Sequence, residues 1–165
     1  MSRVGEASAN VSAAGVTELE RLYREQGQRM WRALYAYAGD PEVASDAVSE
    51  AFAQALRRGD AIREVDRWVW RSAFRIAAGE MKRRRDVPVQ AFVDATYEME
   101  EPARELLEAL RYLSAKQRAA VVLHHAGGYP VSEVAAIIGS TTAAVKVHLM
   151  RGRRRLRELL EEEDA

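Results

Sequence analysis

The segment from residue 131 to residue 149, VSEVAAIIGSTTAAVKVHL, constrains the fold of this chain most strongly. A short helix over 131–138 reaches Gly139, which can take the positive φ of a tight turn, and a second helix runs from about Thr142 to Leu160. Ala135 is small where the two helices approach each other closely. This arrangement predicts a helix-turn-helix. The side chains expected to fix it to a core are Val134, Ile138, Val145 and Leu149.

The outer face of the second helix is expected to carry Thr142, Ala143, Lys146, Val147, Met150 and Arg151. Such a helix fits the major groove of DNA, where side chains read base edges. The arginines within residues 151–157 would lie along the phosphates. From residue 114 to residue 157, eight basic residues oppose Glu133 alone, a net charge of +7 (8 − 1). A solvated basic helix is the alternative, but the turn and this charge together favour a DNA-reading segment.

The first half of the sequence predicts three further helices that share one core. Thr17, with Glu20 three residues later, forms a capping box for a helix that ends near Gly39. Asp40, followed by proline, caps a second helix, and a third spans about residues 66–85. Their expected inward side chains are Leu19, Leu22, Tyr23, Met30, Trp31, Leu34 and Tyr35; Val43, Ala47, Val48, Ala51, Phe52 and Leu56; and Trp68, Val69, Ala73, Ile76, Ala77 and Met81.

Residues 86–102 interrupt this helical pattern. They hold two prolines, no convincing period and mostly acidic charge, which is typical of a linker. Helices resume after it, and Ser114 with Gln117 predicts a capped helix start. We therefore predict an all-α protein with two small helical domains joined by an acidic flexible linker. The expected divisions are a disordered N-terminus 1–16, a first domain 17–85, the linker 86–102, a second domain 103–161 with the helix-turn-helix, and an acidic tail 162–165.

Composition excludes several classes of function. The 165 residues include no cysteine, so disulfides, thiolate metal sites and a cysteine nucleophile are excluded. No signal peptide and no apolar run of roughly 18 residues is present, so we expect a soluble cytoplasmic protein without membrane contact of its own. His124 and His125 are adjacent and point about 100° apart on a helix, so they do not share a metal. Without a phosphate-binding loop or nucleophile elbow, we expect no enzyme activity, cofactor or metal.

The order of three longer stretches along the chain is informative: DPEVASDAVSEAFAQALRR, RWVWRSAFRIAAGEMKRRR, and LSAKQRAAVVLHHAGGYPVSEVAAIIGSTTAAVKVHLMRGRRRLREL. The first resembles the polymerase-binding helix of extracytoplasmic-function (ECF) sigma factors, and the second is similar to the helix that follows it. The third looks like their C-terminal, promoter-reading domain. Together they cover nearly all of the chain after residue 16. Arg75-Ile76-Ala77 is usual in the actinobacterial branch of that family.

The resemblance implies a protein that binds core RNA polymerase, places one domain on each promoter element and helps to melt the strands. Asp46 and Glu50 would meet the clamp helices of the polymerase, whose flap is a second contact. The downstream (−10) element would be bound by Arg67, Arg71, Arg75, Lys82, Arg83 and Arg84. The upstream (−35) element would be bound by Thr142, Lys146, Val147, His148, Arg151, Arg154 and Arg155. An anti-sigma factor or another regulator is a further expected partner.

Some positions depart from the family pattern. Its recognition helix commonly reads Val-Lys-Ser-Arg-Leu, whereas here Val147 and His148 replace the serine and the arginine, so that a hydroxyl and a permanent guanidinium are lost.

Trp68 fits the core position of the family, so Trp70 either packs on the first helix, which we favour, or forms an exposed partner surface. Phe52 is expected to pack inside.

Two other functions of the chain stay open: a stand-alone helix-turn-helix regulator, and a sigma-like polymerase-interaction module without initiation activity.

Overall fold

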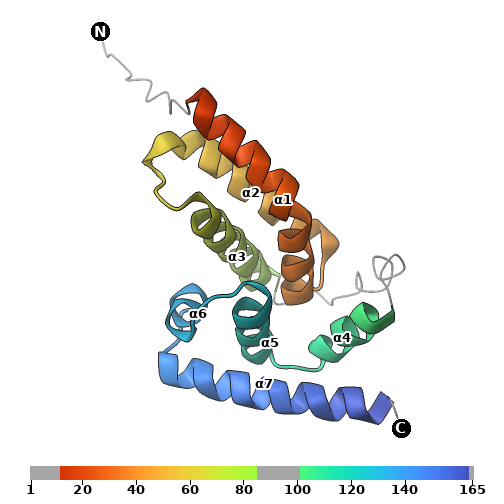
Figure 1. The fold of residues 1–165 in the computed structure, drawn as a ribbon. Coiled ribbons are helices and arrows are strands. Elements are labelled where there is room, and N and C mark those ends of the chain that lie inside the picture. Colours follow the sequence, from red (N-terminus) through yellow and green to blue (C-terminus); the bar gives the residue numbers. More distant parts are fainter. Residues whose placement is uncertain (1–11, 85–100, 164–165) are drawn as a thin grey trace.

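The computed structural model describes residues 12–84 and 101–163, and these ranges are helical without any strand. Two groups of helices are present (Figure 1). We call α1–α3, within residues 13–83, the N-terminal unit, and α4–α7, within residues 101–163, the C-terminal unit. This confirms the all-α prediction with a helix-turn-helix in the second unit. Most of the predicted linker lies outside the described residues.

The N-terminal unit consists of α1 (Ala13–Ala38), α2 (Pro41–Arg58), a short 3₁₀ turn η1 (Gly59–Ala61) and α3 (Val65–Arg83). The junction of α1 and α2 follows the predicted capping chemistry. Gly39 ends α1 in the left-handed region at φ 70°, which glycine tolerates without steric cost. The Asp40 carboxylate then accepts hydrogen bonds from the backbone N–H groups of Glu42 (2.8 Å) and Val43 (3.4 Å).

The start of α1 differs from the prediction. Ser12 is the cap, since its hydroxyl accepts a hydrogen bond from the Gly15 N–H at 3.1 Å. The Thr17 hydroxyl instead donates to the carbonyl of Ala13 at 3.0 Å, as threonine commonly does inside a helix. The predicted capping box at Thr17 is therefore wrong, and the cap lies five residues earlier, at Ser12, so that α1 begins at Ala13.

The C-terminal unit consists of α4 (Glu101–Arg111), α5 (Ala115–Val121), one π-helical turn η3 (Val122–Ala126), α6 (Val131–Ile138) and α7 (Thr142–Glu163). Ser114 and Gln117 form the predicted capping box at the start of α5. The α4, α5 and α6 helices each contact α7, which lies on the side of the C-terminal unit away from α1–α3 (Figure 1).

Tryptophan placement corrects one sequence-based expectation. Trp70 is buried, with 7% of its surface exposed, and its indole N–H donates to Gln26 of α1 at 2.8 Å. This confirms that Trp70 packs on the first helix. Trp68, expected in the core, is only partly buried and lies beside the Arg58 guanidinium, 5.8 Å from the ring centroid. Phe74 occupies the core on α3 instead.

Two other side chains predicted to point inward are exposed: Tyr23 on α1 and Leu56 on α2. Tyr23 still contacts α2, because its ring meets that of Phe52 edge to face with the centroids 5.2 Å apart. Phe52 is buried, as predicted.

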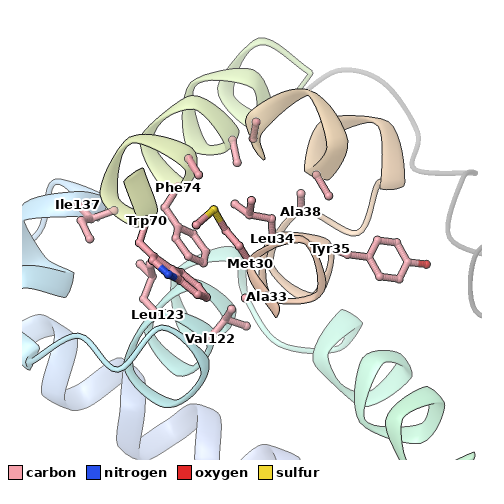
Figure 2. Close-up of a cluster of buried hydrophobic side chains, with 14 of the residues drawn as sticks. Met30, Ala33, Leu34, Tyr35, Ala38, Trp70, Phe74, Val122, Leu123 and Ile137 are labelled. Atoms are coloured by element: carbon pink, nitrogen blue, oxygen red, sulfur yellow. The ribbon is translucent and has the colours of Figure 1, made fainter. Parts of the chain in front are cut away.

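One hydrophobic cluster runs through both units. Figure 2 shows Met30 and Leu34 of α1 beside Trp70 and Phe74 of α3, with Val122, Leu123 and Ile137 of the C-terminal unit approaching from the other side. The Phe74 and Tyr129 rings meet edge to face, with centroids 6.4 Å apart. The two units are therefore packed against each other in this structure.

Candidate nucleic-acid interface

The turn of the helix-turn-helix is built as the sequence predicts. Gly139 closes α6 in the left-handed region at φ 67°, and its N–H donates to the carbonyl of Ala135. Two residues later, the Thr141 hydroxyl accepts a hydrogen bond from the Ala144 N–H at 3.1 Å. This bond satisfies one of the free N–H groups at the start of α7. The turn thus ends one helix and begins the next within three residues.

The inner face of this pair is fixed to the core. Val134, Ala135, Val145 and Leu149 are buried, as predicted. Ile138 was expected to join them but is only partly buried, and its neighbour Ile137 packs into the cluster instead. The α6 helix contacts both α3 and α7.

The outer face of α7 is open to solvent. Thr142, Lys146, Arg151 and Arg154 are exposed, and none of the three cations among them forms an ion pair within the described part of the chain. Arg155 differs, because it lies 3.5 Å from Glu158. A row of cations without internal partners is the electrostatic footprint expected of a surface that meets phosphates.

Two apolar side chains interrupt this cationic face. Val147 is 38% exposed and Met150 is 59% exposed. His148 is only partly exposed, so it reaches the face less directly than Val147. The outer face of α7 therefore combines Lys146 and Thr142 with apolar groups, a mixture that can contact both hydrogen-bonding base edges and thymine methyl groups.

Gly152 is a feature of α7 that sequence reasoning missed. It is buried, and a Cβ atom at this position would lie 2.9 Å from a methyl carbon of Val121 and 3.5 Å from Cβ of Gln117. The glycine allows α5 and α7 to approach closely in the middle of the arginine run. Its position inside RGRRR, where no turn is expected, was the signal that could have revealed it.

The two adjacent histidines have separate structural partners. A ring nitrogen of His124 lies 2.8 Å from the Tyr129 carbonyl, and His125 accepts a hydrogen bond from Arg153 at 2.9 Å. Burial, together with the charge of Arg153, lowers the pKa of His125. Among the residues that the structure describes, no cluster of three or more potential ligands could hold a metal ion.

On α3 and at Arg84, which directly follows it, the predicted downstream-binding residues divide into three groups. Arg75 and Lys82 are exposed and have no ion-pair partner in the described ranges. Arg67 contacts Glu133 of α6 and also lies 3.4 Å from Glu64, while Arg71 lies 3.5 Å from Glu133. The acidic partner Glu133 was not predicted, although it is the only acid between residues 114 and 157.

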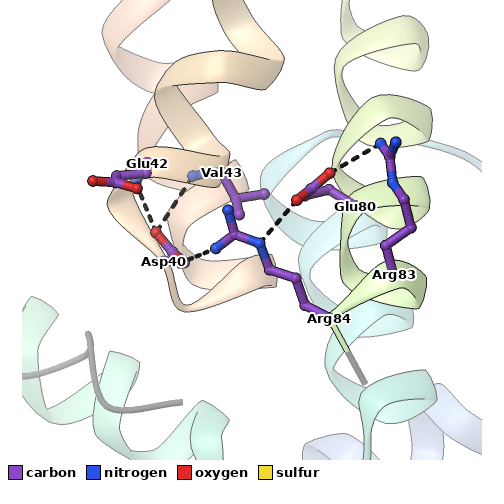
Figure 3. Close-up of polar contacts among 6 residues, drawn as sticks. All are labelled: Asp40, Glu42, Val43, Glu80, Arg83 and Arg84. Carbon is purple, nitrogen blue, oxygen red and sulfur yellow. Dashed lines mark hydrogen bonds and ion pairs between the residues drawn. The ribbon is translucent and has the colours of Figure 1, made fainter. Parts of the chain in front are cut away.

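The third group is held inside the N-terminal unit. Figure 3 shows Arg84 between Asp40 (2.6 Å) and Glu80 (2.8 Å), with Arg83 on the other side of Glu80 at 2.9 Å. The hydrogen bond to Glu80, with the charge of Asp40, raises the pKa of Arg84. Since Asp40 also caps α2, Arg84 ties the end of α3 to the start of α2.

The two predicted polymerase-binding carboxylates lie on α2 in different settings. Asp46 is exposed. Glu50 accepts hydrogen bonds from Gln54 (3.1 Å) and Arg57 (2.7 Å), which lower its pKa. Asp46 is therefore the carboxylate of the two that is more available to a partner.

Comparison with known proteins agrees with this architecture. The family described as Sigma-70, region 4 matches residues 103–156. The chain is 30% identical to the RNA polymerase sigma-E factor of Streptomyces avermitilis over 90% of its length and 88% of that protein. It is 26% identical to the ECF RNA polymerase sigma factor SigL of Mycobacterium tuberculosis, covering 93% of this chain and 97% of SigL.

Among solved structures, the chain resembles the sigma factor RpoE of Bartonella quintana, crystallised with the anti-sigma factor NepR. The TM-score is 0.64 at 25% identity, covering 86% of this chain and 98% of that one. The fold also matches M. tuberculosis SigJ, with a TM-score of 0.60 at 24% identity, covering 86% of this chain and 53% of SigJ.

These likenesses are all to sigma factors of the sigma-70 class, which are transcription regulators. The chain belongs to the extracytoplasmic-function family of RNA polymerase sigma factors. The Streptomyces and Mycobacterium relatives confirm the actinobacterial branch. No helix in the described ranges combines the length and the apolar character needed to cross a bilayer.

Proposed function

We propose that this chain binds core RNA polymerase and directs transcription initiation at promoters that carry an upstream and a downstream element. The observation that carries the proposal is the outer face of α7. It stands on a helix-turn-helix and presents Lys146, Arg151 and Arg154 without internal ion-pair partners among the described residues. The match of residues 103–156 to Sigma-70, region 4 supports the same use of this face.

At the upstream element, α7 would enter the major groove with its N-terminal half. Thr142, Lys146 and Val147 would then face base edges, with His148 beside them. Arg151, Arg154 and Arg155 come later on the helix and would contact the phosphate backbone. This division follows from the order of exposed residues along α7.

At the downstream element, α3 would supply the contacts. Arg75 and Lys82 are available to DNA as they stand, whereas Arg67 and Arg71 must first leave Glu133. Arg83 is three-quarters exposed and can reach a phosphate while it stays near Glu80. Arg84 is the least available member, because it bridges Asp40 and Glu80, and its role would be to hold α3 in place.

The polymerase would be bound through the exposed surface of α2 around Asp46, with Glu50 beside it, against the basic clamp helices, and by the C-terminal unit against the flap. A regulator is a further partner that we propose by likeness, because RpoE of B. quintana was crystallised with the anti-sigma factor NepR.

The test is transcription from genomic DNA with purified core polymerase, with and without this chain, followed by sequencing of the transcript starts. We expect discrete starts that depend on the chain and share two spaced sequence elements. Polymerase binding without any new starts would indicate an interaction module instead. Tight operator binding without polymerase, again with no starts, would indicate a stand-alone regulator.

A further inference from the structure

A strip of apolar side chains runs along the middle of the outer face of α7. Ala143, Val147 and Met150 occupy positions i, i+4 and i+7, which place them on one side of the helix. All three are exposed, Val147 at 38% and Met150 at 59%. We call these three residues the apolar strip. Single exposed apolar side chains are common on proteins, but a continuous row of them marks a contact surface.

The apolar strip points away from the core of the C-terminal unit. Val147 stands two residues after Val145 and two residues before Leu149, so it points about 160° away from both of these buried side chains. The α4, α5 and α6 helices lie on the opposite side of α7 (Figure 1). Val147 is therefore among the side chains that would reach deepest if this face entered a groove.

Cations border the apolar strip. Lys146 lies on one side of it and Arg151 on the other, each about 70° around the helix axis from its centre, and Arg154 follows it along the helix. All three are exposed, and none has an ion-pair partner in the part of the chain that the structure describes. Unpaired positive charge on both sides complements a polyanion, so duplex DNA is the occupant that fits this face.

The chemistry of the major groove identifies what an apolar strip can select. Nearly every group that a base pair presents there is a hydrogen-bond donor or acceptor, and the exception is the 5-methyl group of thymine. Val147 and Met150 carry no donor, so they cannot read the polar groups as Lys146 can. They can bury a methyl group, which is favourable because it removes apolar surface of both partners from water.

We propose that Val147 and Met150 make promoter selection depend on the 5-methyl group of a pyrimidine in the upstream element. At the base pair that meets the apolar strip, thymine is preferred over uracil, and 5-methylcytosine is preferred over cytosine. This use of the strip rests on the proposed function, because it requires α7 to enter the major groove. It adds that one base is selected by burial of its methyl group, so that cytosine methylation at this position would strengthen a promoter.

The experiment uses core polymerase with the full chain on a promoter found by the start-site assay. Each thymine of the upstream element is replaced in turn by uracil, which lacks the methyl group and keeps the hydrogen-bonding groups. We expect binding of the promoter to weaken about fourfold at one or two of these positions and to stay unchanged at the others. With cytosine placed at a sensitive position, 5-methylation should strengthen binding by a similar factor.

The ratio of affinity for the thymine promoter to that for the uracil promoter is then measured in variants, so that a general loss of binding cancels. Val147→Ser and Met150→Ala should bring the ratio at the sensitive positions towards one. Met150→Leu, which keeps an apolar side chain of similar size, should preserve it. Leu106→Ala removes a side chain of α4 that is 43% exposed, and as a control outside the apolar strip it should preserve the ratio as well.

A ratio of one at every thymine in the original protein would overturn the inference. It would also be overturned if the ratio persisted in both Val147→Ser and Met150→Ala, because other residues would then read the methyl group. Equal weakening on both promoters by these variants, with the ratio unchanged, would place the apolar strip against a protein partner instead. Absence of chain-dependent starts would overturn the proposed function and this inference together, whereas starts with a ratio of one would overturn only the latter.

Discussion

At the scale of single residues, the DNA contacts that we propose for the outer face of α7 are of two kinds. Lys146 is exposed one turn into the helix, whereas Arg154 is exposed three turns in. Contacts to base edges discriminate between sequences, while contacts to phosphates strengthen binding to all sequences. From the order of these residues along α7, we propose that Lys146 contributes selectivity and Arg154 general affinity.

We predict that Lys146→Ala changes which upstream element is preferred, with a discrimination of about 1–3 kcal/mol at the affected base pair. Arg154→Ala should instead lower output from every promoter and reduce the salt dependence of binding by about one charge. Run-off transcription from a library with randomised upstream elements, sequenced before and after selection, measures both effects. Equal losses without any change in preference would show that α7 acts only as an electrostatic clamp.

The exposed residues of α7 were predictable because helical periodicity alone decides which side chains face away from Val145 and Leu149. The partner of Arg67 was not predictable in this way. Glu133 lies 66 residues away in the sequence, and no local pattern connects the two. The burial of Trp70 in place of Trp68 also depends on a residue distant in the sequence. Helical periodicity allows either tryptophan to point inward, and Gln26 on α1 favours Trp70 by accepting a hydrogen bond from its indole N–H.

At the scale of helices, local chemistry predicted the boundaries where a side chain caps the backbone directly. Asp40, Ser114 and Gly139 are placed as expected because each cap needs only residues within one turn. Thr17 satisfied the same pattern but lies inside α1. Ser12, which forms the real cap, also binds Asp60 beyond the end of α2 at 3.1 Å. The start of α1 at Ala13, earlier than predicted, is thus accompanied by a tertiary contact between Ser12 and Asp60.

Replacing either of two glycines inside helices should change the free energy of unfolding, in opposite directions. Gly152→Leu should lower the free energy of unfolding by about 1–3 kcal/mol, because the new side chain meets Val121 and Gln117 where α5 and α7 are closest. Gly79→Ala on α3 has nothing within 4 Å of the new Cβ and should raise it by about 0.5–1 kcal/mol through helix propensity. Urea denaturation measures both changes. A Gly152→Leu protein as stable as the original would contradict the close packing of α5 on α7.

At the scale of the whole molecule, the two-unit arrangement followed from the sequence, but the packing of the units did not. The residues at the contact between the two units do not stand out in the sequence. They include Phe74 on α3, a tyrosine that follows two glycines, and Arg118 on the short helix α5. None of these has a sequence signature for a partner on the other unit. Arg118 looks like one more cation of the basic region, yet burial lowers its pKa and Tyr37 accepts its hydrogen bond.

Arg118 should therefore couple the unfolding of the two units. All three tryptophans, Trp31, Trp68 and Trp70, belong to the N-terminal unit, so their fluorescence follows the unfolding of that unit, whereas far-UV circular dichroism reports on the helices of both units. In the original protein we expect the two signals to change together in urea, as in one cooperative transition.

Arg118→Ala leaves the Tyr37 carbonyl without its hydrogen-bond donor. This change should weaken the coupling between the units by about 1–3 kcal/mol and separate the two unfolding curves. Lys116→Ala, an exposed change on the same helix, should leave them coincident. Coincident curves in Arg118→Ala would mean that the other contacts between the units, among them the hydrophobic cluster and the Glu133 ion pairs, couple them without Arg118.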